Sequence, residues 1–326
     1  MKVFVTGGTR VLGQPAVRRL VEQGHTVRGL AHSAGSDDVL RRLGAEPVHG
    51  DLFDPASLRQ AIGDAEAVLH MATRIPPTNK MKHAEAWAEN DRIRIEGTRN
   101  LVDAALADSV QVFVYESVTL GYPDRGAAWI DAATTTPVKS GPPDSTLDAE
   151  AAVERFAAAG HRGISLRFGG LYGPTAPHIQ DMLSYARKGI APLFGPKDGY
   201  QSSTWVDDAA TALVVAMERA PSGIYDVVDD EPLPRQDLIA AIAKAAGKKR
   251  LWQFPGFLTR LMVGSQVYEM LGRSQRVSNR RFKEATGWSP SVPNARIGWD
   301  RLSAQSTSPS ETMKATRDRA PGTSSF

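Results

Sequence analysis

The first twenty residues show an abrupt change of hydrophobic pattern. Residues 3–6 form a continuous β-branched and aromatic run, which predicts a buried parallel strand. Glycines follow at positions 7, 8 and 13. The next apolar residues recur at helical spacing, at Val11, Leu12, Ala16, Val17, Leu20 and Val21. The pattern therefore predicts a strand, a glycine turn and a helix.

Short apolar runs and helical patterns go on alternating along the chain. The further predicted strands cover residues 25–31, 46–49, 65–70, 110–115, 164–168 and 224–228. The predicted helices include 83–106, an Ala-rich helix ending at Gly160, 209–219, 235–246, 257–271 and 279–286. Alternating strands and helices are typical of an α/β fold with a doubly wound parallel Rossmann sheet.

The regular alternation of predicted strands and helices ends at about residue 173. We predict a dinucleotide-binding Rossmann core over residues 1–173, to which residues 203–228 return. Residues 174–202 and 229–302 are predicted to form a smaller C-terminal lobe that covers the substrate. Residues 303–326 are rich in Ser, Thr, Lys and Arg without apolar periodicity, so we predict a disordered tail.

The glycine turn carries the first functional prediction. A strand, a glycine turn and a helix leave free backbone N–H groups and a positive dipole end where a pyrophosphate can bind. Arg10 stands where a full glycine pattern has its middle glycine, so it is either a solvated turn residue or a ligand of a cofactor phosphate. The predicted contacts of this turn are Gly7, Thr9, Arg10, Val11, Leu12 and Gly13.

The end of the second strand bears on the choice of cofactor. In dinucleotide folds an acidic residue here bonds the ribose 2′-hydroxyl of NAD. Ala31, His32 and Ser33 occupy these positions, and none carries a carboxylate. With Arg10, the His32 and Ser33 side chains could bond a 2′-phosphate, although both could also be ordinary loop residues. We therefore predict NADP, with NAD as the second choice.

Two further strand ends complete the predicted cofactor site. Asp51 follows the third strand and can accept from the adenine amino group, while Leu52 packs on the ring. Asp54 is predicted instead to cap the next helix. After the fourth strand, the small residue Ala72 lets a cofactor lie against the backbone. The predicted contacts here are Asp51, Leu52, Met71, Ala72 and Thr73.

The composition limits the classes of molecule that the chain is expected to bind. The formal net charge is only +3 over 326 residues, and no Lys/Arg run favours nucleic acid or an anionic membrane surface. Having no cysteine, the chain forms no disulfide and uses no thiolate, and no His/Asp/Glu cluster predicts a metal site. Without a signal peptide or an apolar span, we expect a cytoplasmic protein that binds a small-molecule substrate and forms a homodimer.

Several motifs occur together in a fixed order: the glycine turn, Gly50-Asp51-Leu52, His70 to Thr73, Glu96 to Ala105, Leu166 to Pro174 and Trp205 to Ala210. In this order they resemble the extended, atypical short-chain dehydrogenase/reductase superfamily, the NAD-dependent epimerase/dehydratase-like proteins. The resemblance covers about residues 1–302. It implies an NAD(P)-dependent oxidoreductase on a Rossmann fold.

The resemblance also implies a catalytic set that this chain lacks in part. Family members use a Ser or Thr after the fifth strand and a Tyr-x-x-x-Lys pair on the following helix. Ser117 matches the first position, but Thr146 and Glu150 occupy the tyrosine and lysine positions. No tyrosine in the chain has a lysine four residues later. A threonine hydroxyl is far too weak an acid to replace a phenol.

Three functions stay open at this point. The first is hydride transfer on a carbonyl or alcohol of a small apolar or aromatic metabolite, with Ser117 and Thr146 orienting the oxygen. The second is an epimerase- or dehydratase-type reaction in which Glu150 moves a proton; alternatively, Glu150 belongs to a solvated helix face. The third is a non-catalytic dinucleotide-binding sensor.

Two sets of side chains are candidates for supporting roles. Other proton carriers are His70, Glu116, Tyr122, Tyr172 and His178. An apolar substrate pocket could be lined by Met71, Ile75, Trp87, Trp129, Trp252, Phe254, Phe257, Leu258 and Met262, although most of these are expected to be core residues.

Overall fold

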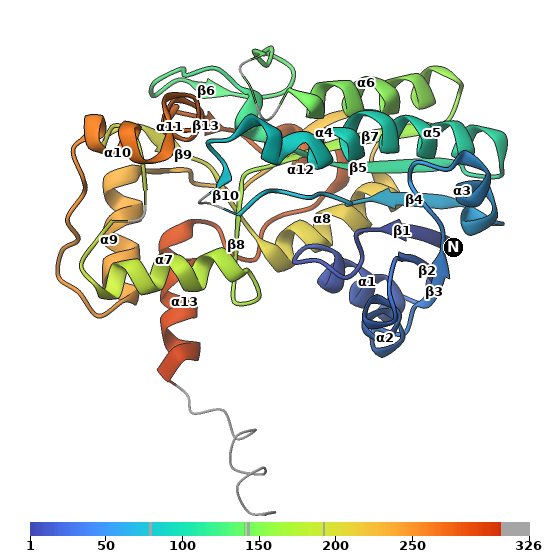
Figure 1. The fold of residues 1–326 in the computed structure, drawn as a ribbon, viewed down its shortest axis with the longest axis horizontal. Helices are drawn as coiled ribbons and strands as arrows, with labels where there is room; N and C mark the ends of the chain where they lie inside the picture. Colours follow the sequence, from blue (N-terminus) through green and yellow to red (C-terminus); the bar gives the residue numbers. More distant parts are fainter. Residues whose placement is uncertain (78–79, 140, 142–143, 192, 308–326) are drawn as a thin grey trace, which may run out of the picture.

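A seven-stranded parallel sheet forms the centre of the molecule (Figure 1). The computed structural model describes residues 1–77, 80–139, 141, 144–191 and 193–307. The strand order is β11-β7-β5-β4-β1-β2-β3. The strands are β1 (Lys2–Thr6), β2 (Thr26–Ala31), β3 (Glu46–His49), β4 (Ala67–His70), β5 (Val112–Val118), β7 (Arg162–Phe168) and β11 (Gly223–Val227). The predicted doubly wound α/β fold is confirmed.

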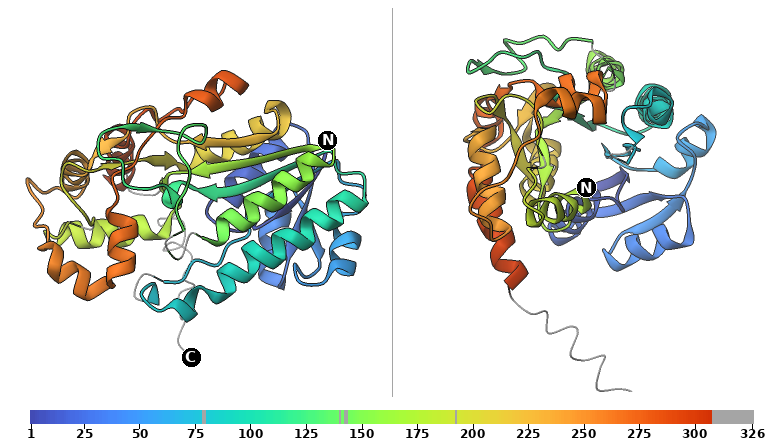
Figure 2. Two further views of the ribbon diagram at one scale, coloured as in Figure 1. Left: turned by 90° about the horizontal axis from the view of Figure 1, so that it is seen from above. Right: turned by 60° about the vertical axis from the view of Figure 1, so that its left-hand side comes forward.

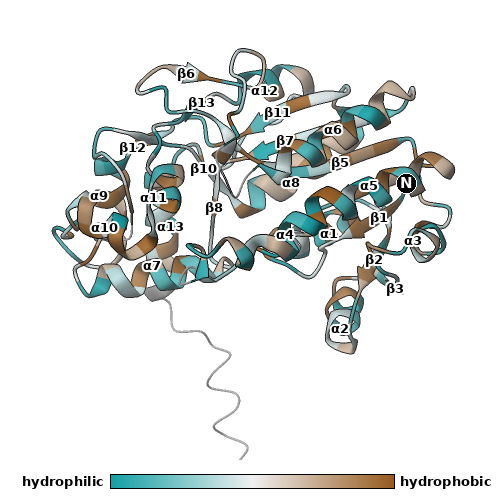
Figure 3. Ribbon diagram, turned by 45° about the horizontal axis from the view of Figure 1, so that its top comes forward, coloured by the Kyte–Doolittle hydropathy of each residue, from teal (hydrophilic) through white to brown (hydrophobic). Residues whose placement is uncertain are grey.

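Helices cover both faces of the sheet (Figure 2). One face carries α1 (Gly13–Glu22), α2 (Ala34–Arg42), α8 (Val206–Arg219) and α12 (Arg280–Thr286). The other carries α3 (Pro55–Ile62), α5 (Thr98–Ala107) and α6 (Ser145–Ala158). Val3 and Val5 enter the first core and Phe4 the second. Burial on both faces explains why strands such as β1 and the first part of β5 have hydrophobic residues at successive positions (Figure 3).

A second lobe is built around α7 (Pro177–Arg187), α9 (Arg235–Ala245) and α13 (Ala295–Thr307). These helices share a core that includes Ile179, Leu238 and Trp299. Short strand pairs join the lobe to the sheet: β8 (Gly170–Tyr172) with β10 (Ser203–Trp205), β9 (Tyr200–Gln201) with β12 (Leu233–Pro234), and β6 (Trp129–Ile130) with β13 (Arg276–Val277).

Two of the predicted helices are not continuous. The helix predicted over 83–106 is a series of turns, η2 (Ala84–Trp87), α4 (Ala88–Arg92), the π-helical η3 (Ile93–Gly97) and α5. The helix predicted over 257–271 is divided into α10 (Gly256–Val263) and α11 (Ser265–Gly272). Gly264 between them has a φ of 87°, which an α-helix cannot contain.

The fifth strand and the C-terminal helix also differ from the predictions. The fifth strand runs to Val118, because residues 116–118 continue to pair with β7. Helix α13 was missed, and it extends to Thr307, so the predicted tail begins inside a helix. The rest of the tail, residues 308–326, lies outside the described residues. None of the helices in the described part of the chain combines the length and hydrophobicity that a membrane crossing requires.

Candidate active site

Two glycines of the β1–α1 turn leave no room for a side chain. Gly7 has a φ of 74°, and a Cβ added there would overlap the carbonyl of Met71. A Cβ on Gly13 would overlap the carbonyl oxygen of Gly7. The first turn of α1 contains no acidic residue, and Leu12 before it makes no side-chain cap. The amides at this end therefore fit the anionic phosphates of a dinucleotide.

The other predicted residues of the turn differ in exposure. Arg10 is exposed and its backbone N–H donates to the Gly7 carbonyl. Thr9 and Val11 are half-buried, and Leu12 is buried in the core on the α1 face. The structure therefore places the Arg10 guanidinium in solvent beside the turn, where it is free to meet a phosphate.

The ends of β2 and β3 lie along the same edge of the sheet. His32 and Ser33 are exposed, and Ser33 caps α2 by accepting from the Ser36 amide at 3.2 Å. Asp51 is exposed and its carboxylate accepts from the Phe53 amide at 2.9 Å. Leu52 is buried in the core on the α5 face.

Past the β4 strand end, Met71 is buried while Ala72 and Thr73 are half-buried. Because Met71 and Ala72 pack against Gly7, the structure brings this segment and the glycine turn together. The predicted cap is also confirmed, since the Asp54 side chain accepts from Ala56 at the start of α3.

Glu150 and Arg167 form a buried ion pair where the family resemblance implies a lysine. Arg167 donates from Nε to Oε1 of Glu150 at 2.8 Å and from Nη2 to Oε2 at 2.6 Å. The Ser117 hydroxyl also donates to Oε1, at 2.6 Å. All three residues are at most 4% exposed. Glu150 is therefore no part of a solvated helix face, and both its oxygens already accept hydrogen bonds.

The ion pair continues into a chain of hydrogen bonds. Nη1 of Arg167 donates to the Tyr122 hydroxyl at 2.9 Å, and that hydroxyl donates to Asp226 at 2.8 Å. The Ala132 amide donates to the second Asp226 oxygen at 2.7 Å. Burial raises the pKa of Tyr122, and it raises the pKa of Asp226 to about 7. The network joins β5, α6, β7 and β11 through side chains.

Ser117 and Thr146, which were predicted to be catalytic, have different positions relative to this hydrogen-bond network. Ser117 lies within β5, not beyond it, because it pairs with Arg167 of β7. Its hydroxyl is fully buried and is directed at Glu150. Thr146 is buried in the first turn of α6, one turn before Glu150 on the same face. Contact of either hydroxyl with a substrate stays a prediction.

A second buried arginine lies nearby. Arg94 of η3 is 3% exposed and donates to the Tyr115 hydroxyl and, at 3.4 Å, to the backbone carbonyl of Glu116. Burial raises the pKa of Tyr115 to about 12, and the charge of Arg94 opposes that rise. Burial likewise raises the pKa of the Glu116 carboxyl to about 7, again opposed by Arg94.

Sequence reasoning missed Arg94 and Arg167 as site residues. A signal for Arg167 was present, because an arginine within a buried parallel strand requires an acidic partner. Arg94 gave a weaker signal, since an arginine within a helical pattern usually points to solvent. In both cases the partner is distant in sequence, and only the fold brings it near.

Other candidate proton carriers are already engaged. His70 is fully buried between the hydroxyls of Thr6, at 2.6 Å from Nδ1, and Thr98, at 3.0 Å from Nε2. Burial lowers its pKa to about 3, so it stays neutral. Tyr172 donates to Asp229 at 2.9 Å. His178 is hydrogen-bonded to the Leu171 carbonyl at 2.8 Å.

The side chains predicted for an apolar pocket are divided between core and surface. Met71 and Trp87 are buried. Ile75, Trp129, Trp252, Phe257 and Met262 are at least half exposed. The Trp129 ring lies under the guanidinium of Arg276, with 4.2 Å between Cζ and the ring centre.

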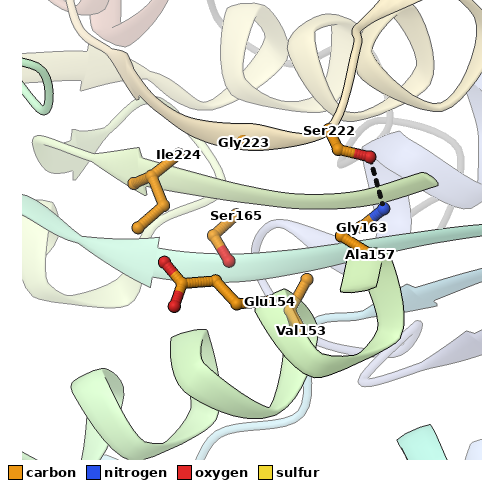
Figure 4. A pocket seen from close by; sticks show the side chains of 8 residues that line it. All are labelled: Val153, Glu154, Ala157, Gly163, Ser165, Ser222, Gly223 and Ile224. Atoms are coloured by element: carbon orange, nitrogen blue, oxygen red, sulfur yellow. Dashed lines mark hydrogen bonds between the residues drawn. The ribbon is translucent and has the colours of Figure 1, made fainter. Parts of the chain in front are cut away.

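A separate hollow of about 170 Å³ lies between α6, β7 and β11, away from the glycine turn (Figure 4). Glu154 and Ser165 are among its lining residues, and the buried Ser165 hydroxyl has no partner within the described residues. No three His, Asp or Glu side chains of the described residues gather as they would around a metal ion.

The fold and the glycine turn define a Rossmann-type dinucleotide-binding protein. Residues 3–227 match the NAD dependent epimerase/dehydratase family. The chain is 31% identical over 314 residues to a 3-diazoavenalumate denitrifying reductase from a Streptomyces species, covering 92% of this chain and 100% of that one. The chain therefore belongs to the NAD dependent epimerase/dehydratase family, and the predicted resemblance is confirmed.

Further relatives agree with this assignment. A 2-alkyl-3-oxoalkanoate reductase of Stenotrophomonas maltophilia is 29% identical over 281 residues, which cover 81% of this chain and 82% of that one. A human epimerase family protein solved with NADPH has the same fold, with a TM-score of 0.75 at 20% identity over 93% of this chain and 99% of that one. The reductase names and the family together support an enzyme.

Proposed function

We propose that this chain is an NADP-dependent reductase that transfers a hydride to the carbonyl carbon of a small apolar or aromatic metabolite. Two relatives that align over most of this chain are reductases by name, for 3-diazoavenalumate and 2-alkyl-3-oxoalkanoates. A third, from Stigmatella aurantiaca, is a ketoreductase of a farnesyl-substituted dihydroquinoline oxide. These names favour an apolar or aromatic substrate.

The observation that carries the choice of reaction is the buried Glu150–Arg167 pair. In the epimerase-type alternative, Glu150 has to take a proton from a substrate carbon. Both its oxygens accept hydrogen bonds from Arg167, and Oε1 also accepts one from Ser117. Removing Glu150 from this pair would leave a buried cation without compensation, which is costly. Hydride transfer makes no such demand on Glu150.

The cofactor assignment rests on the edge formed by β1 and β2. The amides around Gly7 and Gly13 fit the pyrophosphate, and Arg10, His32 and Ser33 fit a 2′-phosphate because none of them is acidic. When bound, the reduced dinucleotide supplies a hydride to the substrate. NAD is the second candidate, because a solved family-fold neighbour, the Bacillus cereus UDP-glucuronic acid 4-epimerase, was determined with NAD.

Within the site, we assign different tasks to the two predicted hydroxyls. Thr146, one turn from Glu150, orients the substrate oxygen by a hydrogen bond. Ser117 acts as a positioning residue, because its hydroxyl holds Glu150 in place at 2.6 Å. The Glu150–Arg167 pair then replaces the missing lysine as the element that joins α6 to the sheet.

The test is the loss of the dihydronicotinamide absorbance when the purified chain meets a panel of 2-alkyl-3-oxo acids and aromatic ketones with NADPH. Consumption of NADPH, faster than of NADH, is the expected result. Tight NADPH binding without consumption across the panel would instead support a sensor. Solvent deuterium in recovered substrate, without net cofactor turnover, would support the epimerase-type reaction.

A further inference from the structure

Glu116 differs from every other candidate proton carrier of the site. His70, Tyr122 and Tyr172 use their polar side-chain atoms in hydrogen bonds inside the protein, and His178 uses Nε2. Within the described residues, nothing donates a hydrogen bond to the Glu116 carboxylate and no ion pair holds it. The residue is 9% exposed, and its oxygens are not sealed from solvent.

The position of Glu116 places this carboxylate at the mouth of the crevice. Tyr115 pairs with His70, so Glu116 comes level with Met71, the first residue beyond β4. The Met71 carbonyl in turn packs against Gly7 of the glycine turn. In open parallel sheets, ligands bind in the crevice beyond these carboxyl ends. Only β4 therefore separates the strand of Glu116 from β1 and the glycine turn that follows it.

The alternation of β5 decides which way the side chain points. Phe113 and Tyr115 enter the core on the α5 and α6 side. Val112 and Val114 enter the core on the α1 side, and Glu116 has the same parity. The carboxylate thus lies on the face from which α1 and its glycine turn approach the crevice.

The charged surroundings of Glu116 are few. Arg94 of η3 is the nearby cation, bound to the Glu116 carbonyl and to the Tyr115 hydroxyl. On β4 the neighbouring His70 stays neutral, and on β7 the residue opposite Glu116 is Leu166. Glu150 of α6 is turned to Arg167. Burial opposes the charged form of Glu116 and Arg94 favours it, so both protonation states are accessible near neutral pH.

We propose that Glu116 is the catalytic acid of the reduction, which gives its proton to the substrate oxygen, and that Arg94 stabilises the carboxylate left behind. This inference rests on the proposed reductase function and names the residue that replaces the absent tyrosine.

The step balances as follows. The reduced dinucleotide, which the turn around Gly7 and Gly13 would hold, would supply a hydride with its two electrons to the substrate carbonyl carbon and would itself be oxidised. The C=O π bond breaks, and its electron pair goes to the oxygen. That oxygen forms an O–H bond with the proton released from the Glu116 carboxyl. The alcohol leaves, and the Glu116 carboxylate, whose charge Arg94 favours, is reprotonated from water.

The test compares Glu116→Gln with Glu154→Gln, an exposed glutamate of α6 outside the site. In Glu116→Gln, the kcat with the best panel ketone should fall about 100-fold or more. NADPH affinity by fluorescence titration and the KM should stay within about twofold. The wild-type kcat should decline as the pH rises through about 7, because only the protonated carboxyl donates. Glu154→Gln should match the wild type.

A second readout is independent of turnover. In infrared difference spectra between pH 6 and pH 8, the band of a protonated carboxyl should titrate and should be missing in Glu116→Gln. Since burial also raises the pKa values of Asp226 and Asp229, the comparison is made in an Asp226→Asn, Asp229→Asn background. A band that persists in Glu116→Gln in that background overturns the proposal.

The outcomes separate the two proposals. A wild type that never consumes NADPH with the panel overturns the reductase function and this inference with it. A wild type that turns over, with Glu116→Gln keeping its kcat and pH profile, overturns only the role of Glu116. If Glu116→Gln does not fold, Glu116→Asp decides, since a retained carboxylic acid should give a partly active enzyme with a shifted pH inflection. An unshifted inflection contradicts the proposal.

Discussion

The two halves of the sheet's carboxyl edge are built on different principles. At β1 and β2, the site is made by backbone: two glycines that tolerate no Cβ and a helix start without a side-chain cap. At β5 and β7, it is made by side chains: the Glu150–Arg167 pair and the hydrogen bonds from Ser117, Tyr122 and Asp226. The first half keeps Gly7 and Gly13 of the pattern that the family resemblance implies and departs from it only at Arg10, whereas the second half has lost both the tyrosine and the lysine.

The difference teaches where this protein is free to change its chemistry. A backbone cradle binds phosphate whatever side chains surround it, so its geometry constrains only the glycines. A pair of buried side chains can be exchanged, provided that every buried charge finds a new partner. Here an acid at the lysine position is matched by Arg167, a base in the neighbouring strand. Four experiments test this contrast.

The largest effect is expected from Arg167→Met. The substitution leaves Glu150 buried without its cation, which should lower the free energy of unfolding by about 3–5 kcal/mol. Chemical denaturation followed by circular dichroism measures it. The control is Arg155→Met, which removes an exposed pair with Asp103 of the same 2.6 Å length and should cost about 0–1 kcal/mol. If the two variants lose the same free energy of unfolding, the buried ion pair contributes no more to stability than the exposed one.

The glycine turn should respond next. In Gly13→Ala the new methyl group overlaps the Gly7 carbonyl, and the turn must shift. A distortion of about 2 kcal/mol corresponds to roughly a 30-fold weaker affinity for NADPH, measurable by isothermal calorimetry. Gly35→Ala is the control, because its Cβ would meet only the Ser33 hydroxyl at 3.9 Å. Unchanged NADPH affinity in Gly13→Ala would contradict the backbone cradle.

A smaller effect should appear in the pH dependence of stability. The pKa of Asp226 is raised by burial to about 7, so the folded chain binds more protons than the unfolded chain between about pH 4 and pH 7. This contribution to stability is present at low pH and is lost as the pH rises through 7. Relative to the wild type, Asp226→Asn should therefore gain on the order of 1–2 kcal/mol between pH 6 and pH 8.

Denaturation curves at several pH values measure that difference. Asp226→Asn also alters the hydrogen bonds from Tyr122 and Ala132, which changes the free energy of unfolding by the same amount at every pH. The test is therefore how the difference in free energy between the two proteins changes with pH, not its absolute size. Parallel pH profiles for the two proteins would contradict a raised Asp226 pKa.

The smallest effect concerns Arg10. Removing its guanidinium in Arg10→Ala should weaken NADP by about 1 kcal/mol, or roughly fivefold, and leave NAD nearly unchanged. Calorimetry with both dinucleotides gives the two values. The exposed Arg18 of α1 provides the control, because Arg18→Ala removes the same charge without altering the turn. Equal weakening of NADP and NAD would remove Arg10 from the specificity argument.

Most of the sheet could be predicted because its strands are buried on both faces and its helices are amphipathic. Strand β4, whose four residues are all buried, was predicted to within two residues of its observed bounds for this reason. The failures are places where local pattern and tertiary pairing disagree. Residues 116–118 contain a Glu and a Ser, which suggested the end of a strand, whereas pairing with β7 extends β5 through them. Helix α13 was missed because few of its residues are apolar, although Trp299 and Leu302 are deeply buried.

Part of the candidate site could likewise be predicted from the sequence, and part could not. The glycine turn could be recognised because glycine is required at fixed, adjacent positions. The fate of Glu150 could not, because its partners Arg167 and Ser117 lie 17 and 33 residues away and their contact depends on the fold. Likewise, no pattern separates Glu116 from other strand-end carboxylates until the hydrogen bonds of its neighbours are counted.

The placement of β11 has a consequence for how the chain is made. It pairs with β7, yet α7 and the β8–β10 pair of the other lobe lie between the two strands in sequence. While residues 169–222 are being translated, one edge of the β7 strand has no partner, and a strand of another nascent chain could pair with it. Rapid pairing of β11 with β7, once Val227 has left the ribosome, would then protect newly synthesised molecules from aggregation.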